Sequence, residues 1–199
     1  VGESSRKGSV ALVVEPLPAG VVTPRLNGTN VADIDKLAEV LVSVLGRLPG
    51  RPRRVALAVP DCAAKVALVR LDQVPSRVVE LEKLLHWRAR KTAPFRSEDT
   101  QLAYVGGVLT ESGGQEFAVT LMRRDIIEEY EAACTRAGVH AGIVDLSSFG
   151  LINAVLASGA SHHGDWLLVH AASGYCSLAV VREGRLVLFR VRVSDGAEE

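Results

Sequence analysis

The sequence has few of the residues that usually mark a chemical site. Its three cysteines, Cys62, Cys134 and Cys176, are widely spaced, and no two of them form a Cys-x-x-Cys pair. An odd number of separated cysteines provides no disulfide framework and is typical of reduced, buried side chains in a cytosolic setting. Because the chain begins at Val1 and its one methionine is Met122, we expect it to be a piece of a longer protein.

An excess of charge of either sign is also missing. Lys and Arg together number 23, as do Asp and Glu, so the formal net charge is zero. This balance argues against electrostatic binding of nucleic acid. The sequence contains no apolar run near the roughly 20 residues that span a bilayer, and no basic-then-apolar signal segment. We therefore expect a cytoplasmic protein without direct membrane insertion.

Catalytic and metal-binding motifs are absent as well. The sequence has no P-loop, no G-x-S-x-G motif and no nucleophile at a readable spacing from a base. The adjacent pair His162-His163 is interpreted as part of an exposed linker, because neighbouring side chains on a loop do not converge on a metal without further ligands. His86 is interpreted as a surface or interface histidine. The residues alone indicate neither an enzyme nor a metal site.

What the sequence does contain is 48% apolar residues in regular patterns. Period-2 alternation predicts strands, and apolar residues at i, i+3, i+4 and i+7 predict amphipathic helices. Hairpins and crossovers alternate, which predicts an α/β fold with a mixed sheet. The predicted order is a strand at 8–15, a helix at 30–48, strands at 55–59 and 66–71, a helix at 76–93, strands at 100–109 and 115–122, a helix at 125–137, a strand at 140–146, a helix at 148–157 and three strands within 167–190.

Local residues refine several of these elements. Asn30 is predicted to cap the first helix, and Asp125 with Glu128 forms a capping box in its Asp form. Pro60-Asp61 supplies turn chemistry, so the runs 55–59 and 66–71 are predicted to form a hairpin.

Two further features carry structural predictions. Gly106-Gly107 lies inside a strand, which predicts a bulge or a close backbone approach rather than a phosphate loop. Trp87 is predicted to be mostly buried in its helix, at a cost of about 3–5 kcal/mol for Trp87→Ala.

The segment "LLVHAASGYCSLAVVREGRLVLFR", residues 167–190, has the outline of a nucleotide-binding hairpin. Two apolar runs flank a turn of small residues, 171–174, and the turn Glu183-Gly184 leads into a third run. In one large class of ATP-binding folds, such a turn holds phosphate and a carboxylate at the end of the first strand holds the metal. His170 occupies that carboxylate position here.

Five stretches together resemble the PilM family of type IV pilus assembly proteins. In addition to the hairpin, they are "VVEPLPAGVVTPRLNGTNVADIDKLAEVL", "RRVALAVPDCAAKVALVRLDQVP", "LEKLLHWRARKTAPF" and "RAGVHAGIVDLSSFGLINAVLA". Their order and spacing agree over nearly the whole chain. The resemblance implies a partial actin-like (RNase H-like) ATPase fold, with a small inserted subdomain like that of FtsA; the cytoplasmic domain of GspL is related.

The resemblance also implies a domain organisation. Residues 1–70 and 138–159 are similar to the first large subdomain, 71–137 to the small inserted subdomain, and 160–199 to the start of the second large subdomain. The first phosphate hairpin is expected before Val1 and the adenosine-binding part after Glu199, so the chain is expected to cover about half of the family's fold.

For the nucleotide site, the family pattern reads roughly Asp-x-Gly-x-x-x-Thr, and ATP is the cofactor in the family. His170, Ala172 and Cys176 stand at those three positions, and Ser147 stands at the acidic position after "VD". A methyl group at 172 crowds a phosphate, and a thiol is a weak donor. The chain is therefore expected to bind no cofactor and to lack ATPase activity, and the remaining phosphate contacts are Ser173, Gly174 and Ser177.

By resemblance, the expected function is that of a cytoplasmic scaffold of the type IV pilus machinery. It would dock a short cytoplasmic peptide of an inner-membrane partner of the PilN type in a groove between the large and inserted subdomains, and it would contact other pilus platform proteins. An extended peptide with side-chain pockets fits such a groove. Two alternatives are an actin-like or sugar-kinase-like ATPase and a GspL-type component of the type II secretion platform.

Overall fold

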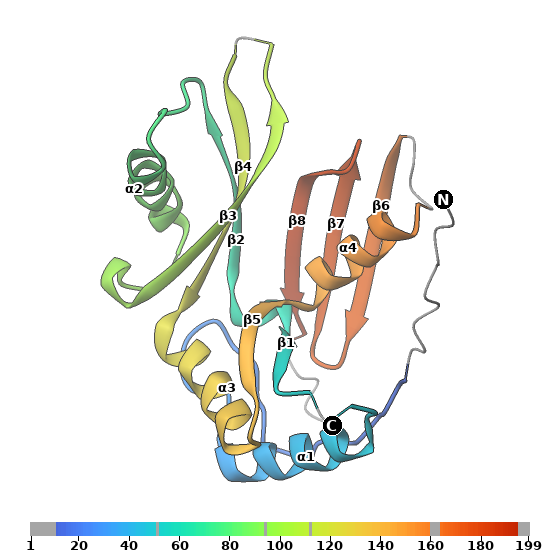
Figure 1. Ribbon diagram of the computed structural model, residues 1–199. Coiled ribbons are helices and arrows are strands. Elements are labelled where there is room, and N and C mark those ends of the chain that lie inside the picture. The colour runs from blue at the N-terminus through green and yellow to red at the C-terminus, as the bar shows by residue number, and fades with distance from the viewer. Residues whose placement is uncertain (1–10, 51, 94, 112, 160–163, 195–199) are drawn as a thin grey trace, which may run out of the picture.

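The computed structural model describes residues 11–50, 52–93, 95–111, 113–159 and 164–194 (Figure 1). From the first helix onward, the helices and strands follow the predicted order. They are α1 (Ile34–Arg47), β1 (Arg54–Val59), β2 (Lys65–Leu71), α2 (Val78–Ala89), β3 (Thr100–Leu109), β4 (Gln115–Arg123), α3 (Arg124–Arg136), β5 (His140–Leu146), α4 (Ser147–Ser158), β6 (Asp165–Ala172), β7 (Tyr175–Arg182) and β8 (Arg185–Val193), with short 3-10 turns at Asp61–Ala63, Arg90–Thr92 and Ser97–Asp99.

The first predicted strand, 8–15, is not formed where the structure describes it. Residues 8–10 lie outside the described residues, and residues 11–15 belong to no strand. The side chains of Leu12 and Val14 are exposed. Alternating apolar residues predict a strand only when a neighbouring strand pairs with their backbone, and the described part of the chain supplies no such neighbour.

The strands lie in three sheets. β1 and β5 form a parallel pair, β2-β4-β3 an antiparallel sheet and β6-β7-β8 a second antiparallel sheet. Parallel and antiparallel pairing therefore both occur, in separate sheets. The hairpin predicted for β1 and β2 is wrong. The 3-10 turn Asp61–Ala63 follows Pro60 and is buried, and it directs the chain from one sheet into another instead of folding it back.

Two predicted helix caps differ from the structure. Asp33, and not Asn30, caps α1, because its Oδ1 accepts a hydrogen bond from the Lys36 N–H at 2.8 Å. Asn30 is buried in the preceding loop, where its side chain bonds to the backbone of Arg25. Asp125 lies inside the first turn of α3 and pairs with Arg123, which lowers the pKa of its carboxyl group. Its pairing with Arg123 replaces the capping box.

The sheet β2-β4-β3 has one covered face and one open face. Strand alternation points Phe117, Val119 and Leu121 toward α2, where they pack against Leu81 and Leu85. The opposite face carries smaller side chains. The predicted bulge is confirmed, because the β3–β4 register shifts between Gly106 and Leu109. A Cβ atom on Gly107 would lie 2.9 Å from the carbonyl oxygen of Glu116, so the backbones approach too closely for a side chain.

Trp87 is not buried, contrary to the prediction. Its side chain is 44% exposed, and the cationic groups of Arg88 and Lys91 lie over its ring, 5.5 and 4.6 Å from the ring centre. The buried stripe of α2 consists of Leu81, Leu85 and Ala89, spaced four residues apart. Trp87 is two residues from Leu85 and points to another side of the helix, so the cost expected for truncating a buried indole does not apply to it.

Helices α1 and α3 lie side by side (Figure 1), and their apolar faces form one core with β1 and β5. On the other side of the molecule, α4 covers one face of β6-β7-β8 through Ile152, Ala179 and Val181.

Among the cysteines, Cys62 and Cys134 are buried and Cys176 is partly buried. Burial raises the pKa of the Cys62 and Cys134 thiols. The division into subdomains at residues 70, 137 and 159 stays a prediction.

Candidate functional site

A buried polar cluster lies where three parts of the chain meet. Asp61 follows β1, Ser148 is in the first turn of α4, and His170 and Ser177 face each other on β6 and β7. We call these four residues the Asp61 cluster. Asp61 and Ser148 are 0% exposed and Ser177 is 1% exposed. A buried carboxyl group needs hydrogen-bond partners, and the cluster supplies them.

The Asp61 carboxyl group is the centre of this cluster. Its Oδ1 accepts from the Ser148 N–H at 3.0 Å, near the positive end of the α4 dipole. Its Oδ2 accepts from the hydroxyl groups of Ser148 at 2.5 Å and Ser177 at 2.6 Å. Nδ1 of His170 lies 3.3 Å from the same Oδ2 and 3.1 Å from the Ser148 hydroxyl. Residues from one helix, α4, and from two neighbouring strands, β6 and β7, therefore converge on the carboxyl group that follows β1.

The three residues predicted as phosphate contacts occupy different environments. Ser173 and Gly174 form the exposed two-residue turn between β6 and β7, and Gly174 has φ 84°, a left-handed conformation that suits glycine. Ser177 lies on β7, and its buried hydroxyl group donates to Asp61. Neighbouring Tyr175 packs edge-to-face on His170, and burial raises the pKa of its phenol. The phosphate role of these residues stays a prediction.

Metal binding finds no support in the described part of the chain, where no group of three or more His, Cys, Asp or Glu side chains could hold an ion. His162 and His163 lie outside the described residues. His86 lies on α2, an element that contributes no residue to the Asp61 cluster.

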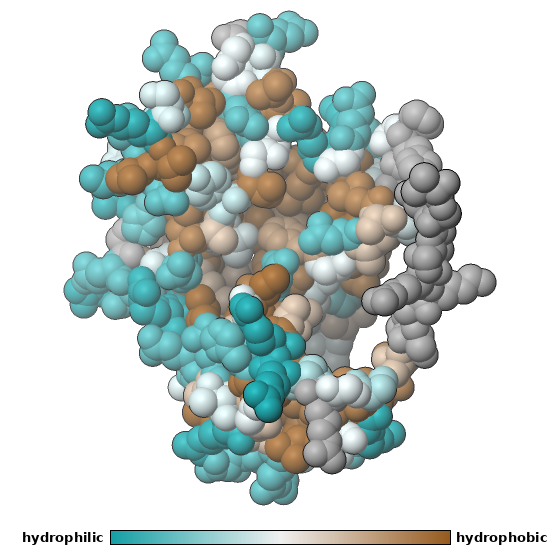
Figure 2. All heavy atoms as spheres, in the orientation of Figure 1, coloured by the Kyte–Doolittle hydropathy of each residue, from teal (hydrophilic) through white to brown (hydrophobic). Residues whose placement is uncertain are grey.

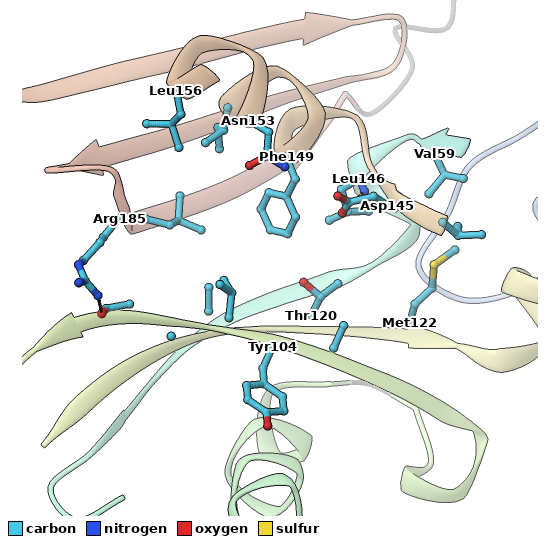
Figure 3. Close-up of a pocket in the computed structure, with 18 of the residues that line it drawn as sticks. Val59, Tyr104, Thr120, Met122, Asp145, Leu146, Phe149, Asn153, Leu156 and Arg185 are labelled. Atoms are coloured by element: carbon cyan, nitrogen blue, oxygen red, sulfur yellow. Dashed lines mark hydrogen bonds between the residues drawn. The ribbon is translucent and has the colours of Figure 1, made fainter. Parts of the chain in front are cut away.

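An apolar groove lies between the open face of β3–β4 and helix α4 (Figures 2 and 3). Its volume is about 390 Å³. We call it the groove. Its floor consists of small or flexible side chains, and its opposite wall is formed by α4. The floor residues are Ala103, Val105, Ala118, Thr120 and Met122, and the wall residues are Phe149, Ile152, Asn153 and Leu156.

Polar groups mark two ends of the groove. Asp145 lies at the end of β5, where its Oδ1 accepts from the Leu146 N–H at 2.8 Å. Arg185 lies at the start of β8, and its guanidinium group donates to the carbonyl oxygen of Gly107 on the β3 bulge (Figure 3). An apolar cleft with a few placed polar groups is the usual form of a binding site.

A family model described as type IV pilus assembly protein PilM matches residues 7–198. The chain belongs to the PilM family. Among solved structures, a chain of the PilM–PilN type IV pilus biogenesis complex matches with a TM-score of 0.78 at 21% sequence identity. The match covers 90% of the present chain and 53% of the chain from the complex. The present chain therefore spans about half the length of the solved chain.

A second solved structure is a Bacteroides thetaiotaomicron protein with an actin-like ATPase fold and unknown function. It aligns over 81% of this chain and 57% of its own, with 11% identity and a TM-score of 0.41, too low to support an argument. The family match and the shared PilM fold confirm the resemblance and the α/β, partial actin-like fold class. None of the helices in the described part of this PilM-family chain has the length and apolar content that crossing a bilayer requires.

Sequence reasoning missed the role of Asp61 and did not place any residue of the groove. Pro60-Asp61 was interpreted as a turn, which is correct locally. Ser148 lies 87 residues after Asp61 in the chain and Ser177 lies 116 residues after it, so only the folded structure brings the three side chains together. One signal in the sequence could have indicated the groove floor: the residues of β3 and β4 that face the groove are mostly smaller than those that alternate with them and face α2.

Proposed function

We propose that this PilM-family chain is part of a cytoplasmic scaffold of the type IV pilus machinery and docks a short cytoplasmic peptide of an inner-membrane PilN-type protein. The observation that carries the proposal is the groove between β3–β4 and α4. Membership of a pilus assembly family and the likeness to a chain of a PilM–PilN complex support this choice of partner. In this role the chain links the membrane partner to other pilus platform proteins.

The chemistry of the groove indicates what kind of peptide it takes. Small floor residues such as Ala103 and Ala118 leave room for the large apolar side chains of a ligand. β3 forms part of the groove floor and lies at the edge of its sheet, so its backbone can bond to an extended peptide. Asp145 at one end offers a carboxyl group to an N–H donor or a cation of the peptide. We therefore expect an extended, mainly apolar segment.

Binding of this peptide is expected to depend little on salt. Apolar contacts and backbone hydrogen bonds would carry the affinity, and the chain has no net charge to attract a ligand over a distance. The measurement is a fluorescence-polarisation titration of the labelled N-terminal peptide of a PilN-type protein, at about 50 mM and 500 mM salt, which brackets the range where screening changes strongly. A scrambled peptide of the same composition is the control.

Two outcomes would contradict the proposal. Equal binding of the scrambled and native peptides would show that the groove does not recognise a sequence. Absence of binding both by this chain and by a full-length PilM-family protein would remove the docking function itself. Binding by the full-length protein alone would place the peptide site in the part that this chain does not contain.

We also propose that this chain does not bind or hydrolyse ATP. Ser177, one of its three candidate phosphate contacts, already donates its hydroxyl hydrogen to Asp61, and His170 stands where the family pattern has a carboxylate. Isothermal titration with Mg-ATP is expected to give no measurable heat of binding. A dissociation constant near or below about 100 µM, equivalent to about −5.5 kcal/mol, would contradict this and revive the ATPase alternative.

A further inference from the structure

The sheet β6-β7-β8 contributes to the groove only through one of its ends. Gly184, Arg185 and Leu186, at the β7–β8 turn, line the groove, whereas the β6–β7 turn lies at the other end of the sheet. The position of the β7–β8 turn therefore depends on how the whole sheet is held against the rest of the chain.

The sheet is held at both ends by polar contacts. At the β7–β8 end, Arg185 donates to the carbonyl oxygen of Gly107 on β3. At the β6–β7 end, Ser177 and His170 reach Oδ2 of Asp61, which belongs to the turn after β1. Between these ends, Ala179 and Val181 pack against Ile152 of α4. The packing is apolar and non-directional, so the polar contacts are what fix the position of the sheet along α4.

We propose that Asp61 is a positioning residue for the groove: its carboxyl group fastens the β6–β7 hairpin to α4 and so keeps the β7–β8 turn in place at one end of the groove. The inference rests on the proposed peptide site for its functional part. Its structural part, the fastening of the sheet, stands on the hydrogen bonds alone.

A carboxyl group suits this position for a physical reason. Three of the groups around it, the Ser148 N–H and the two serine hydroxyls, are donors, and a carboxylate offers acceptors only. Asp61 is completely buried, so water does not replace a lost partner at low cost. Breaking one bond across the cluster should therefore loosen the sheet that it holds, while the cores around α2 and α1–α3 stay intact.

Hydrogen–deuterium exchange tests the fastening directly. In Asp61→Ala and in the milder Ser177→Ala, we expect the backbone amides of β6, β7 and β8 to exchange at least about tenfold faster, because local opening becomes easier. Amides of β2 and β4 should be unchanged. Thr100→Ala is the matched control, since Thr100 begins β3 in a different sheet and its buried hydroxyl group donates to the Arg96 carbonyl oxygen. It should leave β6–β8 unchanged.

The functional part is measured on the same variants by peptide titration. We expect Ser177→Ala to weaken binding of the PilN-type peptide about tenfold, equivalent to about 1.4 kcal/mol. Unchanged exchange in β6–β8, or equally faster exchange in β2–β4, would overturn the fastening, whichever variant is used. Local loosening with unchanged peptide affinity would overturn the positioning role. If the unmodified chain binds no peptide, the proposed function fails, while the exchange data still decide the fastening.

Discussion

His170→Asp is expected to lower the free energy of unfolding by about 2–4 kcal/mol, the cost of bringing a second carboxyl group beside a buried one. The substitution introduces the residue that the family pattern has at this position. In this chain, however, Nδ1 of His170 lies 3.3 Å from Oδ2 of Asp61, which is 0% exposed. A second carboxyl group there would face the first one, and two carboxyl groups sharing a buried site cannot both ionise without a large penalty.

The cause can be separated from a simple loss of the imidazole ring. His170→Asn removes the ring without adding charge, and we expect it to cost about 1 kcal/mol, the usual value of a hydrogen bond. In the double variant Asp61→Asn with His170→Asp, only one carboxyl group remains, so stability should recover by more than half. Urea unfolding in a Trp87→Phe background measures the unmodified chain, these three variants and the single variant Asp61→Asn, because Trp166 on β6 is then the remaining fluorophore of the two tryptophans.

A double variant that is as unstable as His170→Asp alone would contradict this explanation. It would mean that position 170 requires an aromatic ring, for example for its edge-to-face contact with Tyr175, and not a particular charge. The coupling free energy between the two positions is the quantity that distinguishes the two causes.

The strands within 167–190 could be predicted from the local sequence, whereas the Asp61 cluster could not. The three strands within 167–190 were predicted because the small residues 171–174 and the turn Glu183-Gly184 separate apolar runs, and the structure places its turns at 173–174 and 183–184. Asp61 was predicted as a turn residue because Pro60-Asp61 has turn chemistry in any context. Its partners come from α4 and β7, and only the parallel pairing of β1 with β5 brings α4 beside it. Nothing local encodes that pairing.

Trp87 is a different kind of error, one that local sequence could have avoided. The buried stripe of α2 is Leu81, Leu85 and Ala89, and helical geometry places a residue two positions from Leu85 on another side of the helix. Trp87 was predicted to be buried because its helix packs an apolar stripe on neighbouring strands, but the alternation of β4 already supplies Phe117 and Val119 as the large residues of that core. A stack with Arg88 and Lys91 accommodates the ring at the surface.

Ala103→Trp is expected to weaken binding of the PilN-type peptide at least about 100-fold, or about 2.8 kcal/mol. Ala103 is an exposed residue of β3 and forms part of the groove floor, and α4 contributes Phe149 and Ile152 to the opposite wall. An indole there would occupy much of a groove of about 390 Å³. Because the position is open, the larger side chain should cost the fold little, and the melting midpoint should stay within about 3 °C.

The matched control is Ala154→Trp, which adds the same side chain to the face of α4 that points away from the groove. Ala154 is exposed, follows the groove residue Asn153 by one position and is not part of the groove wall. This variant should bind the peptide as the unmodified chain does. Equal loss of affinity in both variants would indicate a general effect of the added indole. Full affinity of Ala103→Trp would place the peptide elsewhere on the chain, because a ligand in this groove cannot share the space above Ala103 with an indole.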